Sequence, residues 1–118
     1  METVLRALKD LRAPVVQEEY DLHALVARAL EQAGIPFRHE APLGPGRRID
    51  FLCGDIGIEV KRGRPSPAVL KKQLTAYLQS DQLTGLILVV ERTAALPPLM
   101  VGKPVKILSL NRLWGIAL

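Results

Sequence analysis

The sequence contains a single cysteine, Cys53, so it cannot form an intramolecular disulfide, and this favours a reducing compartment. No apolar run approaches about 18 residues, so we expect no transmembrane helix. The first residues lack the layout of a signal peptide. No cysteine and histidine cluster has zinc-site spacing, and we interpret His23 and His39 as ordinary histidines. These absences predict a cytoplasmic protein that does not bind a membrane.

The composition is that of one globular domain over residues 1–118. Hydrophobic residues make up 48% of the chain and charged residues 24%, which is enough apolar content for a core. The net charge of +4 and the pI of about 9.6 are compatible with a polyanionic partner without proving one. We find no internal repeat and no low-complexity segment.

Residues 48–61 contain two alternating runs on either side of a Gly54-Asp55 dipeptide. Alternation with a period of two predicts strands, and glycine at the first loop position suits a two-residue type II′ turn. This register places Asp50 opposite Glu59, with Lys61 one step along on the same face. It divides the hairpin into an apolar face and a second face, with Ile49, Phe51, Cys53, Ile56, Ile58 and Val60 on the first and Arg48, Asp50, Leu52, Gly57, Glu59 and Lys61 on the second.

Two facing carboxylates destabilise a sheet unless something compensates their charge. A divalent cation such as Mg²⁺ is the obvious candidate, because hard cations bind oxygen ligands and keep positions for water and phosphate. The plainer interpretation is a solvated outer face on which Asp50, Glu59 and Lys61 form a salt bridge. The hairpin alone leaves both interpretations open.

The rest of the chain predicts an α/β domain in which helices flank a mixed sheet. Residues 1–16 are predicted to form an N-terminal helical extension, 17–91 the core, and 105–118 a last strand and a tail in which Trp114 covers one end of the core. Apolar spacing and turn residues predict the individual elements, which are helices at 2–12, 17–33 and 66–80, strands at 35–41, 84–91 and 105–110, and a loop at 42–46.

Two predicted helices carry polar residues on an inward face. Glu19 lies on the apolar stripe of the helix predicted at 17–33, where a carboxylate usually has a partner. The plainer interpretation of Glu18 and Glu19 is that the helix dipole favours acids in the first turn. Gln73 shares the stripe of Tyr77 on the helix predicted at 66–80, either as a buried amide satisfied by the backbone or as a side chain that reaches the acidic pair.

This arrangement resembles the PD-(D/E)XK nuclease superfamily, which includes restriction endonucleases and Holliday-junction resolvases. The motif residues are Asp50, Glu59 and Lys61, although Ile49 stands where the motif has proline. The resemblance covers residues 17–91 and implies a restriction-endonuclease-like αβββαβ core. Many relatives carry a glutamate on the first helix, which maps best onto Glu19 and second best onto Glu18. Several branches carry glutamine and tyrosine one turn apart, as Gln73 and Tyr77 are here.

The resemblance implies a metal-dependent nuclease, acting on nucleic acid that we expect to be DNA, with Mg²⁺ or Mn²⁺ as cofactor and a homodimer as a possible assembly. Asp50, Glu59, the Val60 carbonyl and Glu19 would hold the metal. Lys61 would act on the attacking water or on the transition state, and Gln73 would orient water or phosphate. The implied nucleic-acid contacts are Arg47, Arg48, Arg62, Arg64, Lys71, Lys72 and Tyr77. The alternatives are a nuclease-like module that binds nucleic acid or protein without cleaving, and an unrelated α/β domain with an accidental acidic pair.

Overall fold

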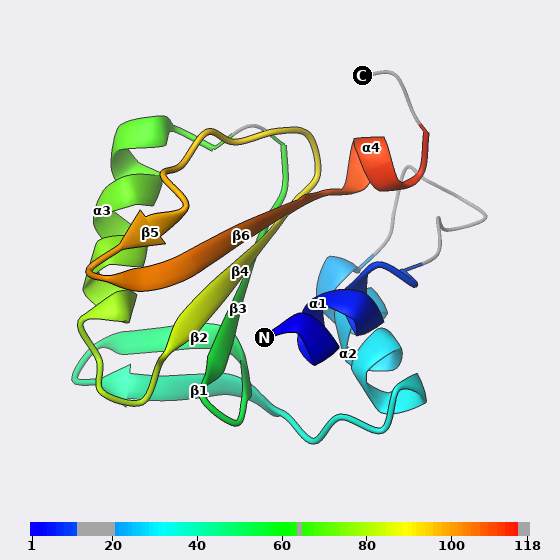
Figure 1. Cartoon of the computed structure of the whole chain (residues 1–118), viewed down its shortest axis with the longest axis horizontal. Coiled ribbons are helices and arrows are strands. Elements are labelled where there is room, and N and C mark those ends of the chain that lie inside the picture. Colours follow the sequence, from blue (N-terminus) through cyan, green and yellow to red (C-terminus); the bar gives the residue numbers. More distant parts are fainter. Residues whose placement is uncertain (12–20, 64, 116–118) are drawn as a thin grey trace.

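The computed structural model describes residues 1–11, 21–63 and 65–115, and these form an α/β fold with a six-stranded mixed sheet and four helices (Figure 1). The helices are α1 (Glu2–Leu8), α2 (Leu22–Gln32), α3 (Pro67–Leu78) and α4 (Leu110–Leu113). The strands are β1 (Arg38–Gly44), β2 (Arg47–Cys53), β3 (Ile56–Lys61), β4 (Gly85–Val90), β5 (Leu99–Met100) and β6 (Lys103–Ser109).

The strands lie in the order β1-β2-β3-β4-β6-β5. β1, β2 and β3 form an antiparallel meander, and β3, β4 and β6 pair in parallel. Every residue of β4 is buried, as the continuous apolar run predicted, because helices cover both faces of the sheet at its centre. β3 therefore stands where the antiparallel and parallel halves of the sheet meet.

Two apolar clusters fill the two sides of the sheet. α1 and α2 pack on one side with Phe51 and Ile58, and this first cluster also includes alternate residues of β4. α3 packs on the other side with Leu52 and Leu88, and this second cluster includes Tyr77. In Figure 1 the sheet runs between α3 at the left and the α1–α2 pair at the right.

The helix predicted from residue 17 begins at Leu22. Asp21 has an extended backbone, and its carboxylate accepts hydrogen bonds from the N–H groups of His23 and Ala24. An aspartate that satisfies two free N–H groups in this way defines the N-cap of a helix. The prediction took Glu18 and Glu19 as the first turn and was wrong about the helix start. Both glutamates lie outside the described residues.

Other predicted boundaries were also wrong. The first helix ends at Leu8 rather than at residue 12. The first strand was expected at 35–41, but β1 begins at Arg38 and runs to Gly44, because residues assigned to a loop pair with the start of β2. The last strand was expected at 105–110, but β6 runs from Lys103 to Ser109, and α4 begins at Leu110. Trp114 does cover one end of the core, since it packs against the first cluster and its indole N–H donates to the Leu11 carbonyl (3.1 Å). None of the helices within the described ranges is long and apolar enough to cross a membrane.

Candidate functional site

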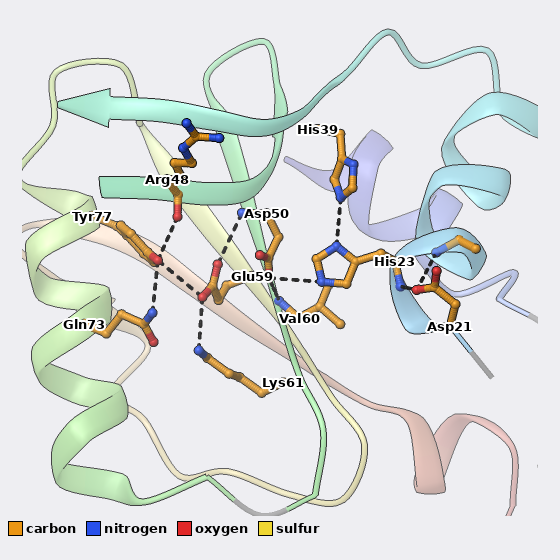
Figure 2. Close-up of polar contacts among 11 residues, drawn as sticks. Asp21, His23, His39, Arg48, Asp50, Glu59, Val60, Lys61, Gln73 and Tyr77 are labelled. Atoms are coloured by element: carbon orange, nitrogen blue, oxygen red, sulfur yellow. Dashed lines mark hydrogen bonds and ion pairs between the residues drawn. The ribbon is translucent and has the colours of Figure 1, made fainter. Parts of the chain in front are cut away.

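The hairpin of β2 and β3 has the predicted turn and the predicted register. Gly54 adopts a positive φ of 61°, as the first loop residue of a type II′ turn requires. Paired residues are Cys53↔Ile56, Leu52↔Gly57 and Phe51↔Ile58. The next step along this register brings Asp50 beside Glu59, and Figure 2 shows both side chains at the place where β2 and β3 meet.

Glu59 is buried, with only 3% of its surface exposed. Its Oε1 accepts a hydrogen bond from the backbone N–H of Asp50 (3.3 Å), and its Oε2 lies 3.2 Å from Nζ of Lys61. Burial and then the neighbouring charge of Asp50 raise the pKa of Glu59 to about 7, although Lys61 opposes them. The acid is therefore held in an environment that penalises its charge.

Asp50 makes the reciprocal contact. Its Oδ2 accepts a hydrogen bond from the backbone N–H of Val60 at 2.7 Å. In an antiparallel strand the N–H and C=O of one residue point to the same side, so the Val60 carbonyl also points toward β2. Each carboxylate thus bonds to the backbone of the opposite strand. With 22% of its side chain exposed, Asp50 is also more accessible than Glu59.

The predicted division into two faces fails at Ile49. Ile49 was expected beside Phe51, but it packs in the second cluster, next to Gly57. The ladder between β1 and β2 pairs residues on either side of Asp50, and the β1 residue opposite Asp50 in this register, Glu40, has a positive φ of 52°. This conformation is uncommon for a residue other than glycine, so the strands are irregular beside Asp50. Ile49 follows this irregular point and packs on the other side of the sheet from Phe51.

The predicted residues of α3 meet the acidic pair through Tyr77. The Tyr77 hydroxyl donates to the Arg48 carbonyl (2.9 Å) and lies 3.4 Å from Oε2 of Glu59. Gln73 donates from Nε2 to the same hydroxyl at 3.0 Å. Burial and then the charge of Glu59 raise the pKa of Tyr77 to about 12, so this hydroxyl stays protonated. Gln73 therefore reaches the site through Tyr77 (Figure 2).

Two residues at the site were not predicted. His23, on α2, has its Nε2 3.9 Å from Oδ2 of Asp50, and its Nδ1 is 2.9 Å from Nε2 of His39, on β1. His39 is exposed and His23 is partly buried, as expected of ordinary surface histidines, but their contact with each other and with Asp50 was not expected. The signal that could have found His39 is its alternation with Phe37, because this places it on the side of the sheet that faces α2. No local signal pairs it with His23, 16 residues away.

The predicted basic residues have different positions. Arg47 and Arg48 are exposed and line a hollow of about 440 Å³ at the β1–β2 turn, together with Pro42, Gly44 and Gly46. Lys71 and Lys72 are exposed on α3. Arg62 is half exposed, and its guanidinium lies 3.7 Å from Glu91. Arg64 lies outside the described residues.

The donor set at the site is suited to a hard cation. Asp50, Glu59 and the Val60 carbonyl supply oxygen atoms, and Mg²⁺ binds through one or two carboxylates while it keeps several waters. A cation would also compensate the charges that Glu59 and Asp50 bring together. Within residues 1–11, 21–63 and 65–115, no three His, Cys, Asp or Glu side chains are grouped to hold a metal.

Comparisons of the chain with models of known families, with curated proteins and with solved structures give no match. The site therefore has to be interpreted from the residues and contacts of this chain. Those residues are Asp50 on β2, Glu59 and Lys61 on β3, Tyr77 on α3 and His23 on α2.

Proposed function

We propose that this protein is a metal-dependent nuclease that hydrolyses phosphodiester bonds, with DNA as the expected substrate and Mg²⁺ or Mn²⁺ as the cofactor. The order α2-β1-β2-β3-α3-β4 is the one that a PD-(D/E)XK core would have, and this supports the proposal. Asp50, Glu59 and Lys61 would be the motif residues, and all three lie on one hairpin. The helix glutamate of this family, Glu19 or Glu18, remains a prediction.

The observation that carries the proposal is the buried acid of the hairpin. Glu59 is fully buried beside a second carboxylate, and the nearby Lys61 does not restore its ordinary pKa. A buried charge that is incompletely paired lowers stability, and strongly shifted acids are concentrated at functional sites. A protein that needed these positions only for packing would be more stable with neutral residues there.

The roles follow from the contacts. Asp50, Glu59 and the Val60 carbonyl would hold the ion, which when bound lowers the pKa of a coordinated water and stabilises negative charge on phosphate oxygens. Lys61 keeps 28% of its side chain exposed beside Glu59, so its ammonium can contact both this acid and a phosphate or water outside. Tyr77, with Gln73 bonded to its hydroxyl, limits the positions that the Glu59 carboxylate can adopt.

Nucleic acid would be held mainly through its phosphates. The exposed Arg47 and Arg48 at the β1–β2 turn and the exposed Lys71 and Lys72 on α3 can contact the nucleic-acid backbone, and Arg62 and Arg64 follow β3 in the sequence. Phosphate contacts of this kind give affinity that falls with salt and carries little sequence information. We therefore expect weakly sequence-selective binding.

A second candidate is a module that binds nucleic acid without cleaving it. The observation in its favour is that both carboxylates already have hydrogen-bond donors inside the protein, from Asp50, Val60 and Lys61. Such a network could serve the hairpin alone. The two candidates share the binding surface and differ in whether cleavage depends on the acids.

The test is nicking of supercoiled plasmid DNA with Mg²⁺ or Mn²⁺. Cleavage by the wild type should be lost in EDTA and should fall at least about 100-fold in Glu59→Gln and Lys61→Ala. Two matched controls replace exposed residues away from the site, Glu31→Gln on α2 and Lys106→Ala on β6, and should keep full activity. DNA binding by fluorescence anisotropy, with no cleavage of plasmid, single strands or a four-way junction, would favour the non-cleaving module.

A further inference from the structure

His23 and His39 form a pair of imidazole rings at the edge of the site. His39 lies on exposed β1 and stacks on Phe51, with ring centroids 4.7 Å apart and planes at 24°. Its Nε2 is 2.9 Å from Nδ1 of His23, which is a hydrogen-bond distance. The ring of His39 is therefore fixed by a stack and by a bond to His23.

The second nitrogen of His23 points toward the acidic pair. Its Nε2 lies 3.9 Å from Oδ2 of Asp50, longer than a hydrogen bond and close enough for a small shift or an intervening ion to connect them. Figure 2 shows the chain of contacts from His39 through His23 to Asp50. His23 thus presents either an N–H or a lone pair to the Asp50 carboxylate, depending on whether its Nε2 carries a proton.

The bond between the rings couples their tautomers. A neutral imidazole has one N–H and one bare nitrogen, so one ring must donate and the other accept. If His39 donates from Nε2, His23 carries its own proton on Nε2 and presents an N–H to Asp50. If His23 donates from Nδ1, its Nε2 is bare and presents a lone pair on the side of Asp50.

We propose that His39 is a positioning residue that can bond to His23 in either tautomer, and so lets His23 present a lone pair when a cation is held at Asp50. In this change the proton in the bond moves from Nε2 of His39 to Nδ1 of His23. Nε2 of His23 releases a proton to water, and Nδ1 of His39, on an exposed residue, takes one up. No net proton is gained or lost. The catalytic consequence rests on the proposed nuclease function, whereas the tautomer change does not.

Two variants separate the hydrogen bond from the ring stack. His39→Phe keeps an aromatic ring on Phe51 and can neither donate to nor accept from His23. His39→Gln loses the ring but has an amide that can do both. Thermal unfolding of both variants, measured first, checks that the fold is kept.

The first readout is the ring ¹⁵N spectrum of His23 in the whole protein, recorded without metal and with saturating Mg²⁺. In the wild type and in His39→Gln, Mg²⁺ should move the proton of His23 from Nε2 to Nδ1. In His39→Phe this change should be absent, and Mn²⁺ affinity should fall by about tenfold, as expected when the hydrogen-bond partner of a metal-facing histidine is removed. His39→Gln should stay within about threefold of the wild type.

The second readout is plasmid nicking, where His39→Phe should lower kcat and leave the KM for DNA unchanged. The inference is overturned if Mg²⁺ leaves the His23 ring unchanged in the wild type, if His39→Phe behaves as the wild type, or if His39→Gln is as impaired as His39→Phe. A Mg²⁺-dependent tautomer change in a wild-type protein that cuts no DNA would support this inference and refute the nuclease.

Discussion

Replacing Glu59 with glutamine removes the one charged side chain that is fully buried within the described residues. Glutamine has nearly the same shape, and its amide oxygen can accept the N–H of Asp50 as the carboxylate does. Without metal, we expect the variant to be more stable than the wild type at neutral and alkaline pH. The difference in unfolding free energy between the two proteins measures how much stability the acid at position 59 costs.

The size of the effect follows from the pKa of Glu59, which is raised from an ordinary 4.5 to about 7. Below pH 4.5 both the folded and the unfolded chain bind this proton, so its contribution to stability is fully present. As the pH rises toward 7, the unfolded chain releases the proton while the folded chain keeps it, and stability falls. At about 1.36 kcal/mol for each pKa unit, the total loss is about 3 kcal/mol, complete above about pH 7.

The assay is urea unfolding in EDTA between pH 4.5 and 8, followed by circular dichroism and by the fluorescence of Trp114, which packs on the core. The difference in unfolding free energy between Glu59→Gln and the wild type should grow by about 3 kcal/mol in favour of the variant over this range. The exposed control Glu31→Gln should show a nearly constant difference. A constant difference for Glu59→Gln as well would refute the view that burial penalises this charge.

Other predictions test individual contacts of the fold. The ammonium of Lys103 bonds to the carbonyls of Leu78 and Ser80 at the end of α3, at 2.7 and 2.9 Å. Lys103→Met should therefore lower the unfolding free energy in urea melts by about 2 kcal/mol, whereas Lys106→Met, at an exposed position, should change it little. Gly57→Ala places a methyl group against the side chain of Ile49 and should destabilise the folded protein by about 1–3 kcal/mol in thermal melts. If that contact is the cause, the double variant with Ile49→Val should recover part of the lost stability. Burial raises the pKa of the Cys53 thiol to about 11, so the folded protein at pH 8 should react with a thiol reagent only slowly and the unfolded protein rapidly; equal rates would contradict this packing.

The hairpin could be predicted from the sequence because its information is local. The turn at Gly54 fixes the register, and the alternation of apolar residues then decides the face of each side chain up to Phe51. Ile49 does not follow this rule, because the strands are irregular beside Asp50, where Glu40 of β1 has a positive φ and the Asp50 carboxylate bonds to the backbone of β3. Neither is visible in the alternation of the hairpin itself.

The start of α2 illustrates a different limit. Asp21 is a good N-cap, but Glu18 and Glu19 precede it and satisfy the rule that favours acids in a first turn. Two local rules competed, and the cap determined the helix start.

The pair of His23 and His39 had no comparable signal. Their contact joins a helix to a strand, and only the packing of α2 against the sheet brings the rings together. The carboxylates could be predicted to be neighbours, whereas the groups around them come from three further elements of the fold.

The hydrogen bonds that the Asp50 and Glu59 carboxylates accept from the backbone affect how fast two amide protons exchange with water. The N–H groups of Asp50 and Val60 are protected by carboxylates that belong to the site, rather than by carbonyls of a strand ladder. A cation that draws these carboxylates toward itself would take the acceptors from both amides at once. Binding of a cation would then speed deuterium uptake at the amides of Asp50 and Val60, while the amides in the paired part of the hairpin stay protected.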